Sequence, residues 1–347
     1  MVDRLLPLAE LAPLVRDLHD PSPARYWLDL VLTVVALLIA LAIAITGDLL
    51  SSLVAGAAAS VLLLRAGVFI HELSHLPAGR MRGFRIAWHL MVGVPLLMPA
   101  FLYEPHRAHH SIASYAGRDD HDYVRPGWIG LALIAGGSLL LPVGLLIRAL
   151  FLVPLGLASA SVRGWTDRRA SSLGPIGFLH RAPPSEAERR GRRCWSLACT
   201  LYAWTAVVAI AVGWIPGRAV LVLALVLAGT LAINAARMVA SHVYGVPGER
   251  TIHAQFFDSL NFPDHRWKSW WWAPLGLHLH ALHHLFPSIP YHNLPAAHRR
   301  LARKAGADGA YRLVERRSLA RQVAAFVRAG AVRRVGHEDA KAPVRSA

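Results

Sequence analysis

The stretch FIHELSHLPAG (residues 69–79) places the motif His-Glu-Leu-Ser-His at the end of an apolar run. His71 and His75 are four positions apart, so on a helix they share one face. Two histidines at this spacing around a glutamate are typical of zinc proteases, in which both imidazoles bind the metal and the glutamate, here Glu72, is the general base. The same pair also fits one part of a larger metal site. The rest of the sequence has to distinguish these interpretations.

The composition indicates a membrane protein. Of 347 residues, 54% are hydrophobic, and long runs carry no charge, which is typical of a chain that crosses a bilayer several times. The net charge of +16 is carried mostly by arginine and fits loops that face anionic lipid, so we expect no nucleic-acid partner. The only cysteines, Cys194 and Cys199, provide neither a disulfide framework nor the ligands of an iron–sulfur cluster.

Four apolar runs are long enough to cross a bilayer, which takes about 20 residues. They cover residues 26–47, 49–70, 194–216 and 219–241. Short links, Gly47-Asp48 and residues 215–218, join them in pairs. The sequence therefore predicts an all-α integral membrane protein with four transmembrane helices arranged as two hairpins. Arginine density before, between and after the hairpins places both termini and the middle region in the cytoplasm.

Two further apolar stretches, residues 84–103 and 128–160, complicate this count. The second is interrupted by Pro142, Arg148 and Pro154. A single crossing by residues 84–103 would put the histidines that follow it on the opposite side of the membrane from His71. If those histidines meet, both stretches are expected to be interfacial or re-entrant.

The ends of the chain are predicted to lie outside the membrane. Residues 1–25 read as an N-terminal interfacial segment, with leucines at roughly helical spacing. Residues 302–347 read as a basic cytoplasmic region, with a surface helix over residues 310–330 followed by a disordered tail. The membrane domain itself is predicted to span residues 26–301.

Histidines form three patterned clusters beside these spans. Each cluster places its members on one helical face, since they are spaced by three or four positions. Imidazoles at this density suit iron, zinc, copper or nickel, and eight ligands are too many for one ion. The sequence therefore predicts two metals and eight catalytic metal ligands: His71 and His75; His106, His109 and His110; and His280, His283 and His284.

The segments HELSH, HRAHH and HALHH, in this order around two hairpins, resemble the three histidine boxes of the membrane fatty acid desaturase/hydroxylase superfamily. HELSH is similar to the first box of its sphingolipid desaturases, and HHLFPSIP to the wider acyl-lipid branch. The resemblance implies a cytoplasmic helical cap that carries the boxes, two Fe ions as a di-iron centre, and O₂ as co-substrate. It implies an external electron donor of ferredoxin or cytochrome b5 type with its reductase. It also implies a ninth metal ligand, His242.

The resemblance implies an O₂-dependent desaturase that introduces a double bond into the acyl chain of a fatty acid or membrane lipid. A hydroxylase or ketolase of lipid or carotenoid stays open, because the boxes are shared and these reactions diverge only after the first hydrogen is removed. An intramembrane zinc protease is a third hypothesis, although it leaves six patterned histidines unused. The arginine- and alanine-rich composition indicates a bacterial plasma membrane.

Several polar residues near the boxes are candidates for supporting roles. Glu72 is expected to orient an imidazole if the chain is not a protease. The segment GRDDHDY offers Asp119, Asp120 and Asp122 to fix ring tautomers. Arg65, Asn234 and Arg237 lie in or near the spans, where polar side chains are commonly functional or extend to the interface.

Overall fold

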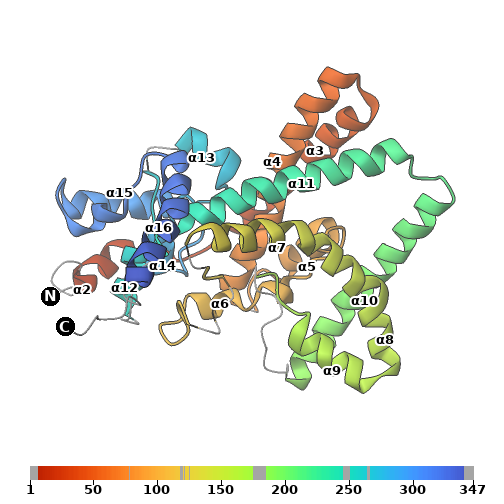
Figure 1. Ribbon diagram of the computed structural model, residues 1–347, viewed down its shortest axis with the longest axis horizontal. Helices are drawn as coiled ribbons and strands as arrows, with labels where there is room; N and C mark the ends of the chain where they lie inside the picture. The colour runs from red at the N-terminus through yellow and green to blue at the C-terminus, as the bar shows by residue number, and fades with distance from the viewer. Residues whose placement is uncertain are drawn as a thin grey trace, which may run out of the picture.

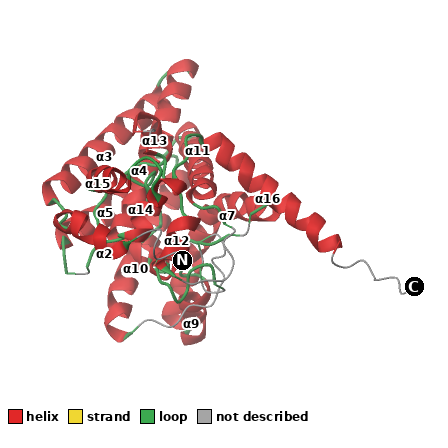
Figure 2. Ribbon diagram, turned by 90° about the vertical axis from the view of Figure 1, so that its left-hand side faces the viewer, coloured by secondary structure: helices red, strands yellow, loops and turns green. Residues whose placement is uncertain are grey.

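The computed structural model describes residues 7–77, 79–117, 120, 122–124, 126–174, 185–244, 251–263 and 266–339. Within these ranges the chain is helical, with loops and no named strand (Figure 2). The longer helices are α3 (Pro23–Thr46), α4 (Leu49–His75), α7 (Trp128–Ile147), α10 (Glu186–Ala211), α11 (Gly217–Ser241), α15 (Leu294–Ala305) and α16 (Leu319–Asp339). The shorter ones are α2 (Leu8–Leu11), η1 (Ala12–Leu18), α5 (Arg82–Trp88), η2 (His89–Gly93), η3 (Ala100–Tyr103), α6 (His106–His109), η4 (Arg148–Leu152), α8 (Val153–Ala158), α9 (Ala160–Arg169), α12 (Ile252–Asp258), α13 (Arg266–Trp272), α14 (His280–Leu285) and η6 (Ala310–Val314).

The first predicted hairpin is present as α3 and α4, which lie side by side (Figure 1). Asp48 begins α4 by accepting a hydrogen bond from the Ser51 amide at 2.7 Å, which satisfies one of the unpaired N–H groups of the first turn. Inside the hairpin, Arg65 of α4 forms an ion pair with Asp29 of α3 at 3.0 Å. The helix continues through HELSH to His75, so both histidines of the motif are helical.

The second predicted hairpin, α10 and α11, is open. The two helices diverge from their connecting turn in Figure 1, and α11 packs instead across α4. At this crossing, the Thr230 hydroxyl donates to the Ser60 carbonyl at 3.0 Å. The close approach depends on Gly229, because a Cβ there would lie 2.6 Å from the Ser60 hydroxyl oxygen. The crossing fixes how α4 and α11 present their ends to the functional site.

Five helices, rather than four, are long and apolar enough to cross a membrane. Four match the predicted spans, and the fifth, Trp128–Ala158, is the stretch that we expected to be interfacial or re-entrant. Pro142 does not break this helix, and a π-helical turn at η4 continues it. The predicted number of four spans is therefore not confirmed. Residues 84–103, by contrast, fold into short pieces (α5, η2 and η3), none of which is long enough to span.

The helices outside the membrane candidates gather at one end of the molecule. In Figure 1, α2, α12, α14 and α15 lie together beyond the ends of α4 and α11 that carry histidines. The N-terminal segment packs into this cap: Leu11 and Val15 are buried in one apolar cluster with Ala297 and Leu301 of α15. The prediction that this segment is interfacial is not tested. The first of its regularly spaced leucines, Leu5, lies outside the described residues.

The C-terminal prediction was wrong in its boundaries. A 3₁₀ turn, η6, occupies Ala310–Val314, and the helix begins only at Leu319 because the intervening residues are extended. The chain stays helical to Asp339, past the point where we expected a disordered tail. Figure 2 shows the end of α16 projecting from the body. Residues 340–347 lie outside the described residues.

The α4–α11 crossing yields a stability prediction. Gly229→Ala should lower the free energy of unfolding by about 1–3 kcal/mol, because the added methyl group overlaps Ser60. Gly136→Ala on α7 is the control, since a Cβ there meets nothing within 4 Å. It should be neutral or stabilise by about 0.5–1 kcal/mol. Unfolding midpoints in detergent measure both, and equal midpoints would contradict the close packing.

Candidate metal centre

Nine histidines from four parts of the chain meet at one end of the candidate membrane helices. His71 and His75 come from the last turn of α4, and His242 directly follows α11. The second box lies on and just after α6, and the third on α14. Seven of the nine residues are buried and the other two, His75 and His110, are partly buried. All nine predicted ligands, His71, His75, His106, His109, His110, His242, His280, His283 and His284, are brought together in two groups.

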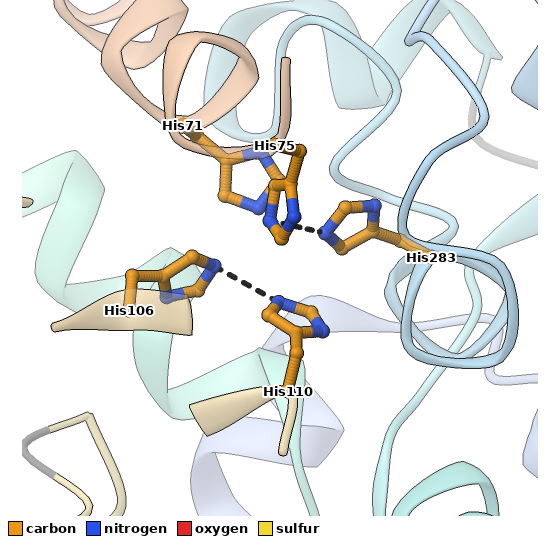
Figure 3. A group of neighbouring side chains, drawn as sticks. All are labelled: His71, His75, His106, His110 and His283. Atoms are coloured by element: carbon orange, nitrogen blue, oxygen red, sulfur yellow. Dashed lines mark hydrogen bonds between the residues drawn. The ribbon is translucent and has the colours of Figure 1, made fainter. Parts of the chain in front are cut away.

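The first group combines all three boxes. Figure 3 shows the rings of His71, His75, His106, His110 and His283 converging on one space. One candidate ligand nitrogen from each residue lies within 4.8 Å of the others. The Nε2 atoms of His75 and His283 are 3.2 Å apart, and those of His106 and His110 are 3.0 Å apart.

The second group contains His109, His242, His280 and His284. His242 Nε2 lies 3.1 Å from His109 Nε2 and 3.0 Å from His280 Nε2, so His242 lies among histidines of the second and third boxes. The two groups adjoin, because the rings of His110 and His284 stack with centroids 4.2 Å apart. Two bound ions would therefore be close neighbours.

The nitrogens of these rings fit metal ions. Imidazole nitrogens bind a metal such as zinc at about 2.0–2.1 Å, so two of them on one ion lie about 2.9–3.4 Å apart. The observed Nε2 separations fall in this range. Both nitrogens of buried His71, and Nδ1 of His283, have no hydrogen-bond partner among the described residues. A buried polar atom without a partner is costly, and a metal removes that cost at the ligating nitrogen.

Burial also keeps most of these rings neutral, as metal binding requires. It lowers the pKa of His283 to about 3, with neighbouring His106 and His109 contributing. The pKa values of His110, His280 and His284 are likewise held well below their usual value, first by burial and then by adjacent imidazoles.

Carboxylates fix the orientation of two ligands, as the acidic segment predicted. His106 Nδ1 lies 2.5 Å from Asp122 Oδ2, and His109 Nδ1 lies 2.9 Å from Asp120 Oδ2. With Nδ1 hydrogen-bonded to a carboxylate, Nε2 is left free to face a metal. Burial lowers the pKa of His109, but the carboxylates of Asp120, Asp122 and Asp258 together outweigh it, so the net shift is upward. Asp119 lies outside the described residues.

Sequence reasoning missed the partners of His242. Its Nδ1 lies 3.2 Å from both the Tyr115 hydroxyl and the Ser259 hydroxyl. Tyr115 in turn donates to Asp258 at 2.7 Å, and Asp258 is fully buried. No motif links them in the sequence, because Asp258 and Ser259 at the end of α12 lie more than 140 positions from Tyr115.

Glu72 does not have the expected contact with an imidazole. Its carboxylate accepts hydrogen bonds from the Tyr26 hydroxyl and from the Tyr291 amide, the latter at 3.3 Å. The nearest ring nitrogen, His71 Nδ1, is 4.0 Å away. Glu72 is therefore held on the side of α4 that faces α3.

An apolar cavity of about 340 Å³ leads from the metal centre into the membrane helices. Histidines from both groups line its inner end, among them His71, His106 and His280. Leucines of α4, α7 and α11, including Leu63, Leu145 and Leu227, line its other walls. This shape admits an apolar chain and brings part of it to the histidines.

Comparisons with known proteins agree with this arrangement. The sequence profile of the fatty acid desaturase family matches residues 48–315, which include all nine histidines. The chain therefore belongs to the fatty acid desaturase family, and with it to the membrane desaturase/hydroxylase superfamily of oxidoreductases. It is 34% identical over 307 residues to a ceramide hydroxylase of Caulobacter vibrioides (strain NA1000 / CB15N), covering 86% of each chain. No solved structure matches.

The two groups yield a prediction on metal content. His283→Ala should remove the ion of the first group and His280→Ala that of the second, so each variant should lose about half of the bound metal. Elemental analysis of anaerobically purified protein measures this. Replacing His298, which is hydrogen-bonded to Tyr311 away from both groups, is the control. Unchanged metal in both ligand variants would contradict the two-group centre.

The carboxylates give a second, graded prediction. Asp122→Asn keeps the shape of the side chain but removes the negative charge beside His106. Loss of such a partner weakens metal affinity by about 10–100-fold. A chelator titration should show one ion leaving earlier than in the parent protein. Identical release curves would mean that Asp122 has no influence on the metal.

Proposed function

We propose that this protein is an O₂-dependent di-iron hydroxylase that acts on the hydrocarbon chain of a ceramide-like membrane lipid. The observation that carries the proposal is the apolar cavity ending at both histidine groups. The relative that hydroxylates ceramide favours hydroxylation over the desaturation that the boxes first suggested. Desaturation stays the second candidate, because the family profile carries that name.

The chemistry explains why a metal centre is needed. An unactivated methylene has no acidic hydrogen, so no side-chain acid or base removes it. Iron with O₂ supplies the oxidising power. The chain's own residues bind the lipid, keep water from the reacting carbon and hold one carbon beside the histidines. In particular, Leu145 and Leu227 face the cavity across from α4 and confine the hydrocarbon chain.

We further propose that two electrons come from a separate carrier of ferredoxin or cytochrome b5 type with its reductase. Cys194 and Cys199 do not suffice for a cluster that stores electrons. The cap helices are proposed to face the cytoplasm of a bacterial plasma membrane, with both termini on that side. Arginines of the cap, such as Arg299 on α15, then lie where an acidic carrier approaches.

A zinc protease is disfavoured by the contacts of Glu72. A general base must reach a metal-bound water, yet the Tyr26 hydroxyl and the Tyr291 amide hold this carboxylate toward α3. Besides His71 and His75, the two groups contain seven further histidines, more than a single zinc site uses.

Product analysis tests the proposal. Purified protein in lipid nanodiscs should convert ceramide to a product that gains one oxygen atom when given O₂ and a reduced ferredoxin. Mass spectrometry with ¹⁸O₂ should place the label in the product. A product that lacks a pair of hydrogens and carries no label would identify a desaturase, and His283→Ala should give neither product.

The role of Glu72 gives a separate prediction. Glu72→Gln retains an acceptor for the Tyr26 hydroxyl, so the protein should keep its metal and most of its lipid oxidation. In a protease the same substitution abolishes turnover, because it removes the base. Lipid oxidation and metal content measured together decide between these outcomes. If the variant lost all activity but kept its full metal content, Glu72 would have a direct role in the reaction.

A further inference from the structure

An arginine lines the apolar cavity near the metal centre. Arg237 lies on α11, and the cavity wall includes Arg237, Asn234 and Ser241 on successive turns of this helix. The guanidinium donates from Nε and Nη2 to Asn234 Oδ1 at 3.0 and 2.9 Å. A guanidinium carries five N–H donors, so most of them are left available for another partner.

The charge of Arg237 has no carboxylate partner among the described residues, within ion-pair distance. Two other arginines on candidate membrane helices, Arg65 and Arg148, have partners outside their own helix. Arg65 pairs with Asp29 at 3.0 Å, and Arg148 donates to the Ala170 carbonyl at 2.9 Å and to the Ser196 hydroxyl at 3.1 Å. An incompletely paired guanidinium in an apolar cavity is costly to the free protein. A ligand with oxygen acceptors removes that cost.

Arg237 lies close to the two histidine groups. It precedes His242 by five residues, which is about 7.5 Å along the helix axis. The same cavity wall includes His106 of the first group and His280 of the second. A group bound to the guanidinium therefore lies near both histidine groups.

We propose that Arg237, supported by Asn234, binds the oxygen acceptors at the polar end of the lipid substrate. This inference rests on the proposed function and deepens it. With the polar end held there, the carbons beside the metals are those a few bonds from the polar group. The enzyme then oxidises the lipid near its head rather than in the middle of the chain. The leucine-lined part of the cavity accommodates the adjoining hydrocarbon.

Two sources supply such oxygens: the amide carbonyl and hydroxyls of a ceramide, or the carboxylate of a free fatty acid. Equilibrium binding to protein in nanodiscs separates them, with a long-chain ceramide, a fatty acid and a linear alkane of matched length as probes. For Arg237→Met, the Kd of the oxygen-bearing lipid should rise about tenfold to a hundredfold, as expected for lost hydrogen bonds to a charged group. The Kd of the alkane should not change, and Arg237→Lys should restore part of the affinity.

Arg218→Met is the matched control. Arg218 lies on the same helix but at the far end, where it hydrogen-bonds Gly47 and Ser52. It should leave all three dissociation constants unchanged. Metal content of each variant is measured in parallel. If Arg237→Met does not retain metal, Asn234→Ala is used in its place. It should raise the Kd of the oxygen-bearing lipid and leave the Kd of the alkane unchanged.

The outcomes separate the two proposals. The inference would be overturned if Arg237→Met left the Kd of both ceramide and fatty acid unchanged. It would also be overturned if the Kd of the alkane rose by the same factor. Arg237-dependent binding of ceramide with no oxidised product would support the inference and contradict the proposed function. Dependence for the fatty acid alone would support the binding site and move the substrate class from ceramides to free acids. The position of the new hydroxyl is a further test, since oxidation at mid-chain would contradict a head-anchored lipid.

Discussion

The structure depends on nine clustered imidazoles, several of which have buried nitrogens with no partner among the described residues. His71, for example, is 3% exposed, and neither of its ring nitrogens has a hydrogen-bond partner among the described residues. Each such atom costs on the order of 1–3 kcal/mol, unless a metal or another partner takes it. A bound metal would therefore help to hold α4, α6, α11 and α14 together. The cap helices pack against α14, which carries the third box, so the packing of the cap also positions the histidines.

The same helices that supply ligands also form the cavity. α4 and α11 cross where Gly229 meets Ser60, and they separate from that point toward their histidine ends. α7 covers the opening between them with Pro142 and Leu145. Because helix packing sets both the ligand positions and the cavity walls, an apolar chain inside the cavity has a defined distance from the metals. A separate binding domain is not needed to position it.

The sequence predicted which histidines lie together because their spacing is local information. Spacings of three and four positions determine a helical face, and the short acidic segment brings Asp120 and Asp122 back to His109 and His106. The count of membrane helices was less predictable. Pro142 and Arg148 read as breaks, yet membrane helices tolerate proline where neighbours satisfy the backbone. The partners of Arg148, Ala170 and Ser196, lie far along the chain, so only tertiary packing shows that the charge is accommodated.

The motif HELSH shows why a local pattern does not determine chemistry by itself. A glutamate that follows a ligand by one position points about 100° away around the helix, so its neighbours decide what it does. Here α3 supplies Tyr26 and the loop before α15 supplies Tyr291, and both hold Glu72 by hydrogen bonds. In a protease that space belongs to substrate and water. The two tyrosines therefore give Glu72 a structural role, and the additional histidines around the motif form a larger site than one zinc ion needs.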